Sequence, residues 1–201
     1  MRASLLIALV APCFLLGGCS HGDPELRLPA DLAAPETDAN LRVNADARDG
    51  CAFAGTWEFT KPNNPPSVYY YGSGTIVFEV IENKLRGAMI EIAHEMLSTN
   101  IPPNFVIIDA VIDPGGRSAT GHWEVISRID GSKVSGSTRY GLSVDGLSYI
   151  VDSTDYEGKF GAHSEYGNKV RTGPCGVAVK YVQDAFDSVR SGKPIPKEYF
   201  Q

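Results

Sequence analysis

The 201-residue sequence has few basic side chains and little histidine. It carries 18 Lys and Arg against 24 Asp and Glu, a net charge of −6. This balance disfavours nucleic acids and anionic lipid surfaces as partners, so we expect no nucleic-acid binding. His21, His94, His122 and His163 are scattered, and no spacing typical of a metal site occurs. We therefore predict neither a metal ion nor a cofactor.

The sequence also lacks the short motifs of common hydrolases. His94-Glu95 has no second histidine at the spacing of a zinc-protease helix. Ser73 and Ser164 lie near glycines, but neither has the Gly-x-Ser-x-Gly spacing of a nucleophile elbow. Asp109, alone in an apolar stretch, fits an acid–base group of raised pKa or a structural acid, and we favour the structural acid. The sequence therefore predicts a protein that is not an enzyme.

No apolar run reaches the roughly 20 residues that a membrane-spanning helix needs. Met1-Arg2 is instead followed by an apolar run of about 13 residues, the length of a signal-peptide core. The run ends in Leu16-Gly17-Gly18-Cys19, with small residues before the cysteine. One basic residue, a short apolar run and small residues predict export from the cytoplasm.

Leu16-Gly17-Gly18-Cys19 resembles the lipobox of bacterial lipoproteins at every position. The resemblance implies removal of residues 1–18, a diacylglyceryl thioether on Cys19, and a further acyl chain such as palmitate on the new amine. Two or more acyl chains hold a protein stably on a membrane. Ser20 is similar to the residue that accompanies export to the outer membrane, with the domain facing the periplasm or, alternatively, the cell surface. A cleaved signal without lipid is the other reading of these residues.

Only four cysteines occur. Cys13 leaves with the signal peptide, and Cys19 is the lipidation site. Cys51 and Cys175 remain as an even pair in an oxidising compartment, so we expect a disulfide between them, with two buried thiols as the alternative.

Residues 19–50 contain no aromatic residue and few large aliphatic ones. Such a segment cannot bury enough apolar surface to offset its ordering entropy. We interpret it as a flexible tether with an end-to-end distance of roughly 30 Å, with a short helix near residues 38–47 as the alternative. Residues 51–190 then form the domain, and residues 191–201 a tail.

Short runs of alternating apolar residues, separated by turn residues, follow Cys51. In the first run Phe53, Trp57 and Phe59 share strand parity around Gly55, which predicts a strand from Cys51 with a bend at the glycine. About eight such runs predict a mainly β fold, an antiparallel up-and-down barrel or a strongly curved sheet. A disulfide between the two ends of the sheet would favour closure.

Apolar residues recur at helical spacing between residues 179 and 189, which predicts a C-terminal amphipathic α-helix. Its apolar stripe needs a surface to cover. Residues 105–112 offer one, because they are apolar on both faces of a strand except at Asp109. Residues 88–98 fit either a strand followed by irregular structure, which we favour, or an amphipathic helix.

Three groups of residues are similar to features of lipocalins: Gly55-Thr56-Trp57 in the first strand, Thr154-Asp155-Tyr156 late in the sheet, and Arg171 near its end. The C-terminal helix is a fourth point of resemblance. This resemblance implies a barrel in which Trp57, Asp155 and Arg171 close the base and have structural roles. It also implies a carrier that holds a hydrophobic ligand inside the barrel.

The segment before the second strand holds the candidate binding residues. They are Asn63, Asn64, Tyr69, Tyr70 and Tyr71. Exposed tyrosine supplies contact area at low entropic cost and is enriched in interfaces, although these tyrosines also fit the start of a strand. In a barrel this loop lies at one mouth.

These observations favour a non-enzymatic envelope lipoprotein that meets the membrane through its lipid and binds a protein. An inhibitor or immunity protein against an envelope-attacking enzyme is of this kind. The alternative is a lipocalin-like carrier of a hydrophobic ligand.

Overall fold

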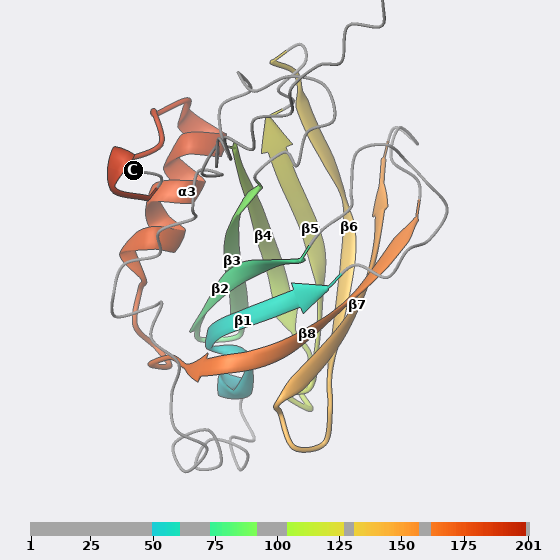
Figure 1. Cartoon of the computed structure of the whole chain (residues 1–201). Helices are drawn as coiled ribbons and strands as arrows, with labels where there is room; N and C mark the ends of the chain where they lie inside the picture. The colour runs from blue at the N-terminus through green and yellow to red at the C-terminus, as the bar shows by residue number, and fades with distance from the viewer. Residues whose placement is uncertain (1–49, 61–72, 92–103, 127–130, 157–161, 200–201) are drawn as a thin grey trace, which may run out of the picture.

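A computed structural model describes residues 50–60, 73–91, 104–126, 131–156 and 162–199 (Figure 1). Within them, antiparallel strands close into one barrel in which each strand pairs with the next and β1 pairs with β8. The strands are β1 (Gly55–Thr60), β2 (Ser73–Ile81), β3 (Lys84–Glu91), β4 (Asn104–Ile112), β5 (Ser118–Ile126), β6 (Lys133–Leu142), β7 (Ser148–Asp155) and β8 (His163–Thr172). The predicted eight-stranded up-and-down barrel is confirmed.

Period-two alternation sorts the side chains into an inner and an outer set. On β6, Val134, Thr138 and Tyr140 are buried inside the barrel, whereas Lys133 and Arg139 are exposed outside it. The inner set forms one apolar core inside the barrel.

A second core lies outside the barrel, under the helix α3 (Lys180–Ser191), as predicted from the helical spacing of its apolar residues. The helix packs on β2, β3 and β4 (Figure 1), which explains why β4 is apolar on both faces. Tyr199, in the short helix η3 (Lys197–Tyr199), is buried against Phe105 and Tyr181. The packed unit therefore extends to Tyr199, beyond the tail expected from residue 191. Among the described residues, no helix is long and apolar enough to cross a membrane.

A buried carboxylate holds the start of α3 against the sheet. Glu79 accepts a hydrogen bond from the Val179 backbone N–H at 2.6 Å, and it forms an ion pair with Arg86 at 2.8 Å. Burial raises the pKa of Glu79, although both partners act in the opposite direction. The helix thus gains the N-terminal cap that the Val179 side chain does not supply.

An ion-pair network holds the other end of α3. Arg190 donates to Asp109 at 2.9 Å and to Glu124 at 2.8 Å, and Lys133 pairs with Glu124 at 2.7 Å. Asp109 therefore faces outward as a structural acid, the interpretation that the sequence favoured. Burial alone raises the pKa of Glu124, but the hydrogen bonds from Lys133 and Arg190 outweigh it and lower the pKa to about 2.

One end of the barrel is closed by the 3₁₀ turn η2 (Cys51–Phe53). The expected strand from Cys51 is wrong, because Gly50 has φ +79° and accepts a hydrogen bond from the Phe53 N–H, which turns the chain beneath the barrel. The predicted disulfide is confirmed: Cys51 and Cys175 are bonded, with Cα atoms 5.4 Å apart and a sequence separation of 124. On the chain-entropy account, a loop of this size stabilises the fold by about 4–5 kcal/mol.

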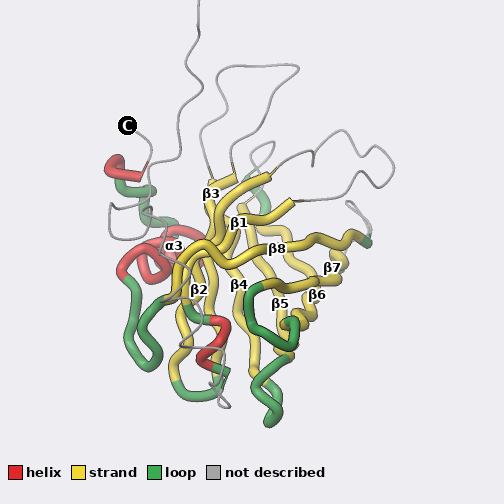
Figure 2. The backbone as a smooth tube through the Cα atoms, turned by 60° about the horizontal axis from the view of Figure 1, so that its bottom comes forward, coloured by secondary structure: helices red, strands yellow, loops and turns green. Residues whose placement is uncertain are grey.

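The other end of the barrel is where β1, β3, β5 and β7 finish and the following strands begin. Figure 2 shows the strand ends and the short turns of the closed end from a second direction. The chain between β1 and β2 holds the candidate residues Asn63, Asn64 and Tyr69–Tyr71, which lie outside the described residues. For residues 88–98, the predicted strand is confirmed as far as Glu91, and the remainder also lies outside the described residues. We refer to this side of the barrel as the open end.

The low pKa of Glu124 predicts a measurable acid sensitivity. A carboxylate whose folded-state pKa is about 2, against 4.5 unperturbed, stabilises the fold above pH 4.5 and loses this contribution as the pH falls toward 2. We expect Glu124→Gln to lower the free energy of unfolding by roughly 2 kcal/mol at pH 7 and by almost nothing at pH 2. Urea unfolding at a series of pH values measures this difference.

Glu58→Gln is the matched control for Glu124, because Glu58 is an exposed outward carboxylate on β1. We expect its effect to be small at every pH. A difference between wild type and Glu124→Gln that stays constant from pH 7 to pH 2 would contradict the network.

Candidate functional site

Aromatic side chains lie over glycines on neighbouring strands inside the barrel. In each pair the two residues are direct cross-strand partners, and a Cβ on the glycine would meet the ring at 2.7 Å or less. The pairs are Phe59 with Gly74, Phe78 with Gly87, Trp123 with Gly136, and Tyr149 with Gly167. The missing Cβ lets a large ring lie along the wall of a narrow barrel.

Four rings fill the lumen toward the closed end. Phe78 and Tyr140 come from β2 and β6, on opposite sides of the ring of strands, and their centroids are 5.3 Å apart. Tyr149 joins them at 6.2 and 5.5 Å and contacts Trp57 at 5.3 Å. We call Trp57, Phe78, Tyr140 and Tyr149 the aromatic plug. It divides the lumen, because side chains cross the whole diameter at this level.

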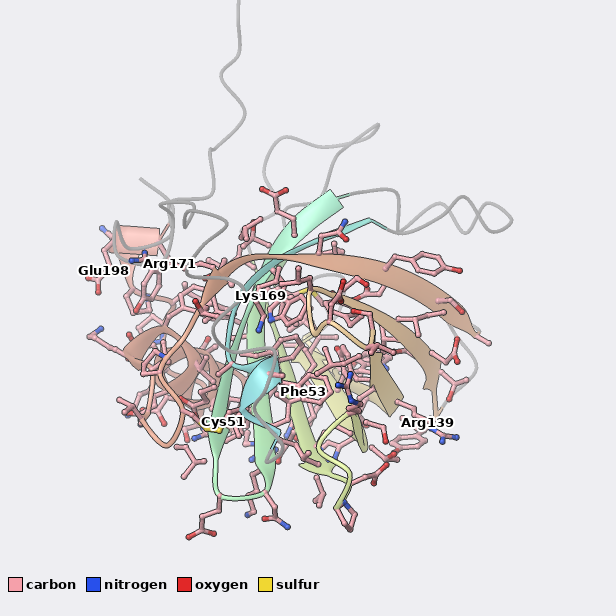
Figure 3. All side chains as sticks on the ribbon, turned by 90° about the horizontal axis from the view of Figure 1, so that it is seen from below. Cys51, Phe53, Arg139, Lys169, Arg171 and Glu198 are labelled. Carbon is pink, nitrogen blue, oxygen red and sulfur yellow. A yellow bond between two sulfur atoms is a disulfide. The ribbon has the colours of Figure 1, made fainter. Side chains whose placement is uncertain are left out.

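Trp57 lies at the closed end, as the lipocalin resemblance implied. Its indole N–H donates to the Phe53 carbonyl at 2.9 Å. The Lys169 ammonium lies 4.6 Å from the centre of the Trp57 ring and donates to the Ala52 carbonyl. Figure 3 views the barrel from this end, with Phe53 near its centre and Lys169 close by.

Strand pairing also places the other two residues of the lipocalin resemblance. Arg171 pairs with Thr56, and a register shift at Thr56/Trp57 then makes Trp57 pair with Lys169, whose ammonium lies over the Trp57 ring. Asp155 pairs with Gly136 at the last position of β7, so its backbone lies at the open end, away from Trp57.

Several inward side chains nearer the open end are buried slightly less completely than the rings of the aromatic plug. Phe59, Met89 and Trp123 are each 8% exposed, and Val106 is 6% exposed. No ring of the aromatic plug exceeds 3%. This part of the lumen, between the aromatic plug and the open end, is the candidate functional site, and we call it the upper lumen.

Polar groups gather on one wall of the upper lumen. Glu165 on β8 is 3% exposed and accepts a hydrogen bond from the Tyr149 hydroxyl at 3.1 Å. Thr138 and Ser153 are hydrogen-bonded to each other at 3.0 Å beside it. Burial, and then the charge on Glu165, raise the pKa of both Tyr140 and Tyr149 well above the usual value. Both tyrosines therefore stay neutral, and Tyr149 donates its hydroxyl proton to Glu165.

Sequence reasoning did not single out Glu165 or Trp123. The only signal for Glu165 is that it shares parity with Gly167 and Lys169, and both faces of β8 are polar, so alternation does not identify the inner one. Trp123 reads as an ordinary strand residue until its partner Gly136 is known.

The described part of the chain offers little support for a metal site. No group of three His, Cys, Asp or Glu residues that could hold a metal ion occurs there. An outer hollow of about 400 Å³ is lined by Ile81, Glu82, Lys84, Arg86, Asp109 and Arg190. Its Asp109 and Arg190 are paired with each other and hold α3, so we assign these two residues to the packing of the helix.

The fold and the site define a class: a closed eight-stranded antiparallel barrel with an outer helix and a partly polar upper lumen. No protein-family model matches the chain, and no curated protein matches it. Among solved structures, apocrustacyanin C1 is similar over 82% of this chain and 87% of that chain, with 16% identity and a TM-score of 0.33. We assign the barrel architecture from the strand pairing alone and infer nothing from this likeness.

The glycine beneath the Tyr149 ring is testable. We expect Gly167→Ala to lower the free energy of unfolding by about 1–3 kcal/mol, because its Cβ would lie 2.1 Å from the ring. Gly141→Ala is the control, since the nearest atom to its Cβ is 3.7 Å away. Guanidinium unfolding of both variants measures the difference, and equal stability of the two would contradict the ring-on-glycine packing.

Proposed function

We propose that this protein is a non-enzymatic, lipid-anchored binding protein of the bacterial envelope that carries an apolar or amphiphilic ligand in the upper lumen. One observation carries the proposal: the barrel is filled across its diameter at one end, while toward the other end its inward residues are mainly apolar and include a few polar side chains. Small-molecule sites combine such an apolar wall with a few placed polar groups. Thr138, Ser153 and Glu165 are those groups.

The envelope location rests on the sequence. Leu16 to Cys19 resembles a lipobox, and the disulfide fits an oxidising compartment. Residues 19–50 would then separate the barrel from the outer membrane. This arrangement suits a carrier that takes up or releases a ligand near a lipid surface.

A protein partner, such as an enzyme that an inhibitor or immunity protein neutralises, is the second candidate. β1 ends and β2 begins at the open end, so the chain with Asn63, Asn64 and Tyr69–Tyr71 starts and finishes there. Pull-down from envelope extracts with wild type and Tyr70→Ala tests this candidate, which requires a specific partner that the substitution weakens.

The carrier proposal predicts that the neutral apolar dye N-phenyl-1-naphthylamine binds the full mature chain with one site. Met89→Trp should weaken dye binding at least about tenfold, because a larger side chain would fill the upper lumen that Met89 lines. The dye's fluorescence titration measures both affinities.

Val111→Trp is the matched control, since Val111 faces outward on β4 and is 50% exposed. It should bind the dye as wild type does. Absence of dye binding by wild type, or equal binding by Met89→Trp, would overturn the carrier proposal, provided circular dichroism shows that the variant is folded.

The lipid anchor predicts a simple labelling result. In a bacterial host that receives the full chain, Cys19→Ala should abolish incorporation of radiolabelled palmitate and move the protein out of the membrane fraction. Cys13→Ala is the control, because Cys13 lies in the segment that is removed, and it should be labelled as wild type is. Labelling that persists in Cys19→Ala would refute the anchor.

A further inference from the structure

The outer hollow lies along the edge of α3, on the outside of the barrel. Strand register places Glu79, Arg86 and Asp109 in one row across the outer face of β2, β3 and β4. Glu79 holds the start of α3 through the Val179 N–H, and Asp109 holds its end through Arg190. Both ends of the helix are therefore fixed along this row, which marks where the cover of the sheet stops.

The floor of the outer hollow is the next row of residues toward the closed end. Ile81 and Lys84 are direct partners there, and Lys84 also lies opposite Val111 on β4. Val111 is 50% exposed and Lys84 is exposed as well, so α3 does not cover this row. Glu82, in the turn between β2 and β3, completes this side of the hollow. Its volume of about 400 Å³ is in the range of small-molecule sites.

Arg86 is a positioned cation on the wall of the hollow. Its guanidinium lies 3.9 Å from the centre of the Phe186 ring and donates from Nη1 to Glu79 at 2.8 Å. A guanidinium has five N–H donors, and the contact with Glu79 uses one of them. Because the ring and the ion pair already orient Arg86, a ligand that binds it orders little additional side chain.

Lys84 is a second cation of the hollow, and its side chain has no hydrogen-bond or ion-pair partner among the described residues. It lies two residues from Arg86 on the same face of β3, a separation of about 7 Å along the strand. Arg190, the third cation, is already engaged by Asp109 and Glu124. Lys84 and the remaining N–H groups of Arg86 can therefore donate together to one bound group.

The charge of the hollow differs from that of the whole chain. Lys84, Arg86 and Arg190 line it against two carboxylates, whereas the chain has a net charge of −6. One of these carboxylates, Asp109, is paired with Arg190. The other, Glu82, is exposed in the turn. Donors that the fold does not use, in a concave site with an excess of cations, suit an anion.

We propose that the outer hollow binds a phosphate group. Lys84 and the remaining N–H groups of Arg86 donate to its oxygens, and Ile81 contacts the carbon atoms of the molecule that carries it. A phosphate monoester has up to about two negative charges and three acceptor oxygens, more than a carboxylate offers to donors from several side chains. A soluble phosphate ester and a lipid head group share this chemistry. The site lies outside the barrel and is independent of the carrier function.

The test titrates the mature chain with two ligands that share a three-carbon body, glycerol 3-phosphate and glycerate. The chain carries Cys19→Ala, so that no acyl chain is attached. We expect glycerol 3-phosphate to give saturable amide shifts at residues 84–86 in NMR spectra, and glycerate to bind at least about fivefold more weakly. Absence of saturable shifts, or equal affinity for the two ligands, would overturn the phosphate site.

Substitutions in the hollow should act in opposite directions. Lys84→Gln should weaken binding of glycerol 3-phosphate at least about fivefold, and Glu82→Gln should strengthen it about twofold, because it removes the opposing carboxylate. Neither substitution removes a contact that holds α3. Lys197→Gln is the matched control, since Lys197 is an exposed lysine on η3 outside the hollow. Equal losses in Lys84→Gln and Lys197→Gln would show attraction by net charge alone and refute the site.

Vesicle flotation distinguishes the two sources of the phosphate group. The same Cys19→Ala chain is mixed with vesicles of phosphatidylcholine alone or with added phosphatidic acid, whose head group is a phosphate monoester. We expect no flotation with either, because the acidic chain is repelled by an anionic surface, and hence a soluble ester as the ligand. Flotation that requires phosphatidic acid and is lost in Lys84→Gln would support the same site with a lipid as its source.

Discussion

The pairing of β1 with β8 is the constraint on which the rest of the structure depends. It closes the sheet, so that each strand pairs with a neighbour on both sides, and it creates an inside and an outside. The buried apolar residues then separate into a core within the barrel and a core beneath α3. The disulfide between Cys51 and Cys175 joins the residues just before β1 and just after β8, so it lies at one end of this pairing and limits how far the two strands can separate there.

Closure also makes the two ends of the barrel different. Beneath the plug, the 3₁₀ turn and the Lys169 contact with Trp57 seal the lumen. Beyond the plug, the inward side chains are smaller or lie flat over glycines, and a carboxylate is placed among them. Burying this carboxylate carries a desolvation cost, which the hydrogen bond from the Tyr149 hydroxyl offsets in part. The asymmetry is what makes the upper lumen a candidate for binding.

The outer face of the barrel is covered by a helix that charged residues hold in place. Helix α3 covers the apolar strands β2 to β4, and charged residues hold both of its ends: Glu79 at the first turn, and Arg190 with Glu124 at the last. Arg86 and Arg190 also lie over the Phe186 ring, at 3.9 and 4.7 Å from its centre. These ion pairs fix the position of the helix, and Asp109 takes part in them through Arg190.

The sequence by itself determined the class of fold. Alternating apolar runs predicted the strands, and the spacing between residues 179 and 189 predicted the helix. Two cysteines in a chain that we expect to be exported predicted the disulfide. The strands and the helix are predicted from local residue patterns, and the disulfide from the number of cysteines, so none of them requires knowledge of the fold. The proposed lipid anchor at Cys19 rests on the sequence alone.

Only the tertiary structure decided which residues face the lumen and which of them meet. The register shift between β1 and β8 places Trp57 opposite Lys169, because one extra residue on β8 changes the register of every later pair. Closure of the barrel turned the Glu165 side chain inward from a strand that is polar on both faces. Strand pairing placed the Trp123 ring over Gly136, which is 13 residues further along the chain. Such contacts depend on register between distant strands, and the amino-acid pattern of one strand carries no information about it.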